Sequence, residues 1–536
     1  VGRAASGRGR AGTLVGSHEP TSPQWGAGSG ASHTGLGATA RVRDVSKLRW
    51  GQLGVWALAT FLIWQSAWLS DDSLITIRTA LNWGSGYGPY FNIDEAVQPY
   101  THPLWFLLIT IVGTVTGSWI YAVLYLNIVC ASIGLLLLLR RTSNLWQLVT
   151  VGLVVVLGNT ALDWSTSGLE GGLSIMLLAI LTSQPIRARP ALWGVTVGLI
   201  LLCRLDFALL LAPWAAVYWW ALKGRRPRLL ASVAVVAPLL MWAVWAQITY
   251  GAILPATFQA KTNSEIPTSE LVSRGWEYVS ESLAYDPIVI LVAVALLPLL
   301  WIAGDLQSKA WVVGVLGYCA YVVAIGGDYM LGRFLMAPLF VCLLEITRTG
   351  LPRPAKSRTF PSVSLLWGLT CALAILGVLN TRAFDWRITQ VHYDPNRPYL
   401  ADERIGWTGW GRSLNPFGAV ERRPAFYPTD LAFLTTQTDN WPVGSAVTQD
   451  PVVVCPGLGA MGMFVGPQVH VIDPCGLTDR FMASLSYTPT GQWKAGHFER
   501  PLPDGYLEAV KYRDATRVRD PALAAELQKL WQVIGR

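Results

Sequence analysis

The feature that most constrains this chain is an uncharged stretch, residues 50–69, that ends beside two adjacent aspartates. The stretch is long enough to cross the hydrocarbon core of a bilayer, which takes about 20 mostly apolar residues. Asp71 and Asp72 follow it after a single residue, Ser70. Charged side chains this close to hydrocarbon are costly and usually functional. The pair therefore predicts chemistry at a membrane surface.

The composition of the whole chain also predicts a membrane protein. Of its 536 residues, 52% are hydrophobic and only 14% are charged, whereas soluble domains carry about 25% charged residues. The net charge of +8 does not indicate nucleic-acid binding, because the basic residues fall mainly in short loops between apolar runs, as in cytoplasmic loops of membrane proteins. We expect the lipid bilayer as a partner and no nucleic acid.

The basic loops give an expected topology. Basic residues in 41–49 precede the first span and place the N-terminus inside. Residues 103–139 could hold two spans, but two spans would put Arg140 and Arg141 outside, so we expect 103–117 to lie as a helix at the outer interface. The eleven expected spans are 50–69, 120–139, 144–162, 168–184, 190–204, 206–222, 228–248, 286–304, 310–327, 331–348 and 360–380.

Three regions follow from this reading. Residues 1–45, rich in Gly, Ser, Ala and Arg, are expected to form a disordered cytoplasmic tail. Residues 46–380 hold the spans, and 249–285 form a long polar loop with helical potential across 269–282. Residues 381–536 are expected to be a small mixed α/β domain outside the cytoplasm, with β-like runs at 445–455 and 468–476 and a helical end at 520–535. Cys455 and Cys475 lie in that domain, and whether they form a disulfide is left open.

Under this topology, charged and polar side chains collect at the outer ends of the spans. The set is Asp71, Asp72, Arg78, His102, Asp163, Glu170, Arg204, Asp206, Lys261, Asp328 and Arg333. Carboxylates there could act as general bases on a hydroxyl, and cations could hold a phosphate. We therefore take Asp71 and Asp72 as candidate catalytic residues. The alternative is that Asp71 caps a helix and Asp72 pairs with Arg78.

Other candidates lie in short segments between apolar runs. Phosphate-binding candidates are Arg78, Arg204, Lys261 and Arg333, and further substrate-binding candidates are His102, Glu170, Asp328 and Tyr329. Each has a plainer alternative. Glu170 could be a helix-start carboxylate, Arg204 could pair with Asp206, and Lys261 could be a solvated surface residue. Arg333 could pair with Asp328, and His102 could be structural.

Several stretches resemble a known class of enzymes. DDSLITIRTALN, GYGPYFN, TSGLE, GGDYMLGRFLMAPLF and GAMGMFVGPQVHVIDPCGLTD, spread over most of the chain, are similar to GT-C glycosyltransferases that use polyprenyl-phosphate sugars. Within that class the chain most resembles the actinobacterial terminal β-(1→2)-arabinofuranosyltransferases. The resemblance places the family's acidic pair at Asp71 and Asp72. It implies a GT-C fold.

The resemblance also implies a function. The expected donor is decaprenyl-phospho-arabinofuranose, and the expected acceptor is the arabinan of arabinogalactan or lipoarabinomannan, at the outer face of the plasma membrane. A polyprenyl-phospho-mannose-dependent mannosyltransferase, a lipid-linked sugar transporter and a non-catalytic polysaccharide-binding scaffold stay open as alternatives. No obligatory cofactor is expected, although a divalent metal held by the pair stays open. The roles of Asp71 and Asp72, and an inverting or retaining route, are also open.

Overall fold

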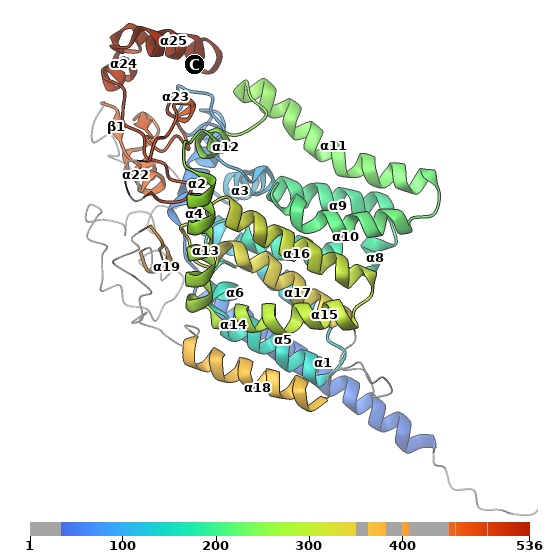
Figure 1. The fold of residues 1–536 in the computed structure, drawn as a ribbon. Helices are drawn as coiled ribbons and strands as arrows, with labels where there is room; N and C mark the ends of the chain where they lie inside the picture. The colour runs from blue at the N-terminus through green and yellow to red at the C-terminus, as the bar shows by residue number, and fades with distance from the viewer. Residues whose placement is uncertain are drawn as a thin grey trace, which may run out of the picture. The chain divides into compact units, whose positions relative to one another are not determined.

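The computed structural model is mostly helical (Figure 1) and describes residues 34–349, 363–381, 399–401, 403–406, 450–455, 457–489, 491 and 493–535. Residues 48–536 form one compact unit. The first helix, α1 (Thr34–Gln65), begins inside the range expected to be a disordered tail. The proposed boundary near residue 380 stays a prediction.

A helix lies at every position where a span is expected. These helices are α1, α4 (Trp119–Leu139), α5 (Leu145–Leu157), α7 (Gly171–Leu181), α9 (Pro190–Cys203), α10 (Phe207–Ala221), α11 (Arg225–Tyr250), α14 to α15 (Pro287–Leu291, a π-turn at Val292–Leu296, and Leu297–Ala303), α16 (Leu306–Ala324), α17 (Met336–Thr349) and α18 (Val363–Asn380). Short helices α6 (Asn159–Asp163), α8 (Gln184–Arg187) and α19 (Glu403–Gly406) and the 3-10 turn η2 (Arg333–Leu335) connect them or lie beside them.

Length and apolarity identify fewer spans than eleven. Within the described residues, α4, α11 and α16 are each long and apolar enough to cross a membrane, and α13 (Thr268–Tyr285) with α14–α15 makes a fourth candidate bent by 106°. Six other apolar helices are shorter. The structure therefore supports a polytopic membrane protein, while the count of eleven stays a prediction. Helix α13 confirms the helix expected within the long loop.

Close helix packing builds the apolar core. In Figure 1, α11 lies along α9 and α10 lies along α16, and α4 likewise packs on α7. The α9–α11 contact depends on Gly194 and Gly198, because a Cβ at Gly194 would lie 2.4 Å from the Ala231 carbonyl oxygen and one at Gly198 would lie 2.5 Å from Pro238. Small residues at such spacing let two membrane helices approach closely.

The first connecting loop carries two helices. Helix α3 (Pro103–Thr116) confirms the helix expected at 103–117 and ends at Gly117 in a left-handed conformation. Helix α2 (Asp71–Gly84) is buried on nearly all sides, including Leu74, Ile77 and Leu81. Two neighbours account for this burial: α3 packs on α2, and so does α22 (Leu458–Val465), a helix of the C-terminal region.

The C-terminal region contains short elements of both kinds. Its strands β1 (Val452–Val453) and β2 (Val471–Ile472) pair in parallel, in the two stretches expected to be β-like. Besides α22, its helices are α23 (Arg480–Ser484), α24 (Tyr506–Tyr512), the 3-10 turn η4 (Ala515–Arg517) and α25 (Pro521–Ile534). Asp520 caps α25 by accepting hydrogen bonds from the Ala522 and Leu523 amides, which accounts for the helix expected at the C-terminal end.

An apolar cluster packs this region on the first loop, and a disulfide links two parts of the region itself. Ile75 of α2 and Phe91 are buried against C-terminal side chains that include Leu458 and Val471. The cysteines that flank α22, Cys455 and Cys475, form a disulfide, which resolves a question that sequence alone left open. Disulfides persist in oxidising compartments, and this bond closes the chain segment that carries α22.

Reduction of this disulfide should loosen the segment that carries α22. The bridge joins residues 20 apart in sequence, and a closed loop of that length stabilises a fold by about 3 kcal/mol. We expect a reductant to lower the thermal midpoint of the purified protein, and to have no effect on a Cys455→Ser/Cys475→Ser double variant, whose midpoint is already lower. An unchanged midpoint in both proteins would contradict a stabilising bridge.

Candidate active site

The two adjacent aspartates begin helix α2 and point to different surroundings. The Ser70 side chain caps the helix by accepting a hydrogen bond from the Ser73 amide at 3.3 Å. Asp71 and Asp72 are then the first two helical residues, and successive residues of a helix project about 100° apart. Their side chains therefore leave the backbone in different directions.

Asp71 holds the start of α22. Its carboxylate accepts hydrogen bonds from the Gly459 amide at 3.1 Å and the Ala460 amide at 2.9 Å. The first amides of a helix have no partner within the helix and carry partial positive charge, so a carboxylate satisfies them well. Gly459 permits this approach, because a Cβ there would lie 2.0 Å from the Asp71 carbonyl oxygen.

Asp71 is only 6% exposed. Burial raises the pKa of its carboxyl from 3.8 to about 6, the amides of Ala460 and Gly459 offset part of that rise, and the charge of Asp72 adds to it. A pKa near neutral is common in catalytic carboxyls. A general base must also be able to reach the proton that it removes, and this geometric condition comes before its pKa. Both oxygens of Asp71 already accept backbone hydrogen bonds. The arrangement favours a structural role for Asp71.

Asp72 faces a polar group of side chains. Its side chain is 22% exposed, and its carboxylate lies 3.5 Å from Nη1 of Arg333. It accepts a 3.4 Å hydrogen bond from the Tyr329 hydroxyl, and it lies 3.8 Å from Nε2 of His497. Asp72 is thus the member of the pair that reaches solvent and potential substrate.

The turn between α16 and α17 supplies three members of this group. Gly326, Gly327 and Gly332 have positive φ angles, which glycine adopts at little cost, and the turn delivers Asp328, Tyr329 and Arg333 to one place. Nη1 of Arg333 lies 3.2 Å from Asp328. The predicted Arg333–Asp328 pair is therefore present, and Arg333 contacts Asp72 as well.

Two lysines and a histidine complete the group. Nζ of Lys494 lies 3.6 Å from the centre of the Tyr329 ring, and the His497 ring meets the same tyrosine edge-on at 4.6 Å. Lys261 also lies close to Gly496: its Nζ is 3.1 Å from the position that a Cβ on this glycine would occupy. Lys261 therefore reaches the C-terminal loop that carries Lys494 and His497. We call Asp72, Lys261, Asp328, Tyr329, Arg333, Lys494 and His497 the Asp72 cluster.

The Asp72 cluster has more cations than carboxylates. Burial and the charges of Lys494 and Lys261 hold the pKa of His497 well below its usual value, so this imidazole is neutral at pH 7. Three cations then surround two carboxylates. No carboxylate lies within ion-pair distance of Lys261 in the described part of the chain. A site with this balance suits an anionic group such as a phosphate.

A second polar network lies beside the Asp72 cluster. Glu170 is 3.2 Å from Nδ1 of His102 and 2.8 Å from Nη1 of Arg204, and Arg204 makes a two-pronged contact with Asp206 at 2.6 and 3.0 Å. A small cavity of about 30 Å³ is lined by Glu170, Arg204 and Arg333, and so joins this network to the cluster.

Arg78 lies away from both groups. Its side chain is fully buried, and it donates hydrogen bonds to the carbonyls of Phe91 at 2.8 Å, Val469 at 3.2 Å and Gly462. It does not pair with Asp72. Because its donors bind backbone carbonyls of both the first loop and the C-terminal region, Arg78 fits a structural role better than phosphate binding.

The structure thus brings together Asp72, Lys261, Asp328, Tyr329 and Arg333, and it places His102, Glu170 and Arg204 in the adjoining network. It moves Asp71 and Arg78 into the contact with α22. Sequence reasoning missed Lys494 and His497, because the region that carries them was expected to be a separate domain. The only signal was the two glycines of GQWKAGH, where Lys494 lies between Gly491 and Gly496 and His497 follows Gly496; they indicate a loop but not where it lies in the fold.

Within the described ranges, one group of side chains has the residue types and spacing to hold a metal ion. Cys455, Asp473 and Cys475 lie close together, but the two cysteines form the disulfide, and Asp473 accepts hydrogen bonds from the amides of Cys475, Leu477 and Thr478. This group therefore fits a structural role. The expectation of no obligatory metal stays a prediction.

Removing the Asp71 carboxylate should destabilise the protein. An Asp71→Ala variant leaves two buried amides of α22 without partners, which costs about 1–3 kcal/mol. We expect a lower thermal midpoint than in the wild type and in Asp72→Ala, which loses a partly exposed side chain. Equal midpoints for the two variants would contradict a structural role for Asp71.

The raised pKa of Asp71 also predicts a pH dependence. The native carboxyl binds its proton more tightly than the unfolded one, so its contribution to stability is full below about pH 4 and is lost as pH rises to about 6. Asp71→Asn, which cannot ionise, should flatten the fall in thermal midpoint over this range. A variant with the wild-type slope would show that another group causes it.

Comparisons with known proteins give the chain two relatives. It is 28% identical over 529 residues to a terminal beta-(1->2)-arabinofuranosyltransferase of Mycobacterium tuberculosis, covering 82% of each chain. It is 24% identical over 559 residues to a protein of the same name from Corynebacterium glutamicum, covering 86% of this chain and 79% of the other. No family profile matches the chain, and no solved structure matches it.

Both relatives carry the name that the sequence motifs suggested, and the matches extend over most of the chain rather than over isolated motifs. The resemblance inferred from the sequence is thereby confirmed: this chain is a glycosyltransferase related to the terminal beta-(1->2)-arabinofuranosyltransferases.

Proposed function

We propose that this protein transfers an arabinofuranosyl residue from decaprenyl-phospho-arabinofuranose to the ends of cell-wall arabinan chains, in arabinogalactan or lipoarabinomannan. The observation that carries the proposal is the position of Asp72 beside three cations. A glycosyl transfer from a lipid phosphate needs both a base for the acceptor hydroxyl and positive charge at the leaving phosphate. The names of the two relatives support arabinofuranose as the sugar.

Arg333 and Lys261 are the proposed ligands of the donor phosphate. Arg333 contacts the two carboxylates of the cluster and is held in place by them. Lys261 lacks such a pair in the described ranges and keeps its ammonium available to an anion. Positive groups fixed before the reaction stabilise charge that develops on a leaving group.

The cavities beside Arg333 suggest a route for the prenyl chain. The cavity lined by Arg204 and Arg333 shares Ile175 and Met336 with a second cavity of about 20 Å³, which is lined by apolar side chains of α1, α4, α5, α6, α7 and α17 and by Ser165. The two cavities thus lie on one path from cations into the apolar helices. We propose that the lipid tail follows this path, which must widen when the donor binds.

Asp72 is the proposed base. In this scheme the acceptor hydroxyl loses its proton to Asp72 and its oxygen bonds to the anomeric carbon, while the bond from that carbon to the phosphate oxygen breaks and its electrons leave with the phosphate. Asp72 and Arg333 are 3.5 Å apart, so base and phosphate lie on the same side of the sugar. This placement favours attack from the leaving-group face, which retains a β configuration if the donor is β-linked.

A double-displacement route would use Asp71 and Asp72 as a nucleophile and an acid–base pair, as retaining glycosidases use two carboxyls. The geometry argues against a catalytic role for Asp71 in such a route, because both of its oxygens already accept hydrogen bonds from amides of α22. The proposed site faces outward from the cytoplasm. The disulfide beside it supports this orientation, since such bonds persist in oxidising compartments.

Asp72→Asn should abolish most transfer without unfolding the protein. Loss of a general base lowers kcat by about 10²–10⁴-fold. The assay is transfer from purified decaprenyl-phospho-arabinofuranose to a synthetic arabinan acceptor, with Asp504→Asn, an exposed carboxylate change, as the control. Activity within a factor of two of wild type in Asp72→Asn would overturn the assignment. Use of a mannose donor alone would instead favour the mannosyltransferase alternative.

Lys261→Gln tests the phosphate site. Removing a cation that binds the donor phosphate should raise the KM for the donor and lower kcat. The thermal midpoint should change little, since none of the ion pairs among the described residues includes Lys261. The control is Lys529→Gln on the exposed side of α25. Unchanged kinetics in Lys261→Gln would remove it from the donor site.

A further inference from the structure

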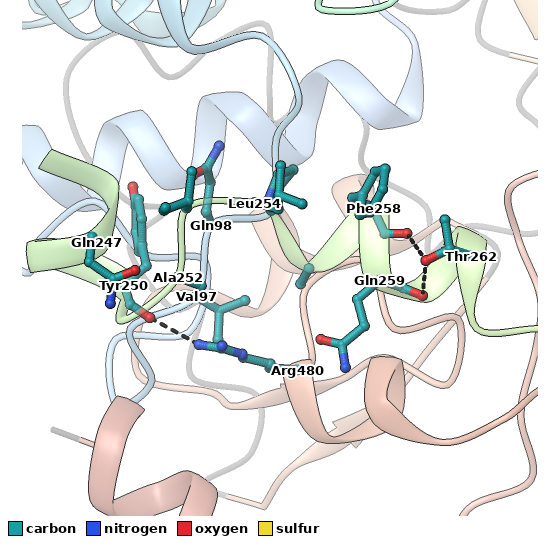
Figure 2. A pocket seen from close by; sticks show the side chains of 13 residues that line it. Val97, Gln98, Gln247, Tyr250, Ala252, Leu254, Phe258, Gln259, Thr262 and Arg480 are labelled. Atoms are coloured by element: carbon teal, nitrogen blue, oxygen red, sulfur yellow. Dashed lines mark hydrogen bonds between the residues drawn. The ribbon is translucent and has the colours of Figure 1, made fainter. Parts of the chain in front are cut away.

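A groove of about 400 Å³ is lined by residues of helix α12 (Ala256–Thr262), the helix that also carries Lys261 of the Asp72 cluster. Figure 2 shows it between the end of α11, the connection to α12, and Arg480 of α23. Its volume is typical of sites that hold small molecules. The polar side chains that line it are Gln98, Gln247, Gln259, Thr262 and Arg480.

The chemistry of this lining fits a neutral sugar. A side-chain amide both donates and accepts hydrogen bonds, as each sugar hydroxyl does, and three of the polar lining residues are glutamines. The aromatic rings of Tyr250 and Phe258 add apolar surface. Among the described residues, the lining has no carboxylate and only one cation, Arg480, which already donates to the Tyr250 carbonyl at 3.0 Å. A phosphate would favour a more cationic site.

Helix α12 connects the groove to the reacting centre. Thr262 lines the groove, and the preceding residue, Lys261, reaches the loop that carries Lys494 and His497. Helix α12 has seven residues, so it is only about 10 Å long. A molecule in the groove therefore lies within a short distance of the Asp72 cluster.

The amides of Gln247 and Gln259 are available to a ligand. Neither side chain has a hydrogen-bond partner within the described part of the chain, and Gln247 is exposed whereas Gln259 is half-buried. Figure 2 shows Gln259 and Arg480 extending toward the same space.

We propose that this groove binds the acceptor chain, holding the sugar residues that precede the hydroxyl to be glycosylated. The inference rests on the proposed function and deepens it, because it makes the groove the part of the enzyme that favours long acceptors over short ones. Exposed Ile253, Leu254 and Phe258 line the same groove, so lipid is the competing occupant.

The test compares acceptors of two lengths. Gln259→Ala and Gln247→Ala should each raise the KM for a long arabinan oligosaccharide about fivefold or more, and leave the KM for a disaccharide acceptor and for the donor unchanged. Gln528→Ala, on the exposed side of α25, is the matched control. Equal effects on both acceptors, no effect on either, or a changed donor KM would overturn the proposal.

A direct binding measurement separates this inference from the proposed function. The full-length protein in detergent is titrated with an arabinan oligosaccharide in the absence of donor. Weaker binding of the oligosaccharide to Gln259→Ala than to Gln528→Ala would support the groove as the acceptor site. If the wild type then transferred no arabinofuranose, that second result would overturn the proposed function and leave the groove assignment standing. Displacement of the oligosaccharide by phospholipid, with equal affinity in both variants, would assign the groove to lipid.

Discussion

The arrangement of the site depends on the contact between the Asp71 carboxylate and the first amides of α22. This contact joins residues 388 positions apart and fixes the C-terminal region on α2. The same junction contains three further features: buried Ile75, the backbone carbonyls that accept hydrogen bonds from Arg78, and the Cys455–Cys475 disulfide. Because the junction is fixed, the loop that carries Lys494 and His497 stands beside Asp72.

The two aspartates divide their work through the direction of their side chains. The buried member has its charge satisfied by helix amides, whereas the partly exposed member shares Arg333 with Asp328. A cluster with one extra cation is ready to receive an anion, and the same excess helps to keep His497 neutral. Binding a phosphate would bring the charges of the cluster closer to balance, which is a physical reason to expect the donor there.

The sequence predicted local structure well and long-range contacts poorly. Apolar runs located the helices, and the expected topology placed Asp328 and Arg333 at the outer ends of spans. It could not predict that Asp71 caps a distant helix, because the partners of a buried carboxylate depend on tertiary packing. The partners of Arg78 could not be predicted for the same reason, since a cation one to two turns from two carboxylates could pair with either. Lys494 and His497 carry no local pattern that shows which loop they approach.

The most direct test of this account is a structure of the protein with a phosphonate analogue of the donor. We expect phosphonate oxygens within hydrogen-bond distance of Arg333 and Lys261, the anomeric carbon beside Asp72, and Asp71 still bound to the Gly459 and Ala460 amides. A structure in which Asp71 leaves α22 and touches the sugar, or in which the phosphonate binds away from Arg333, would contradict it.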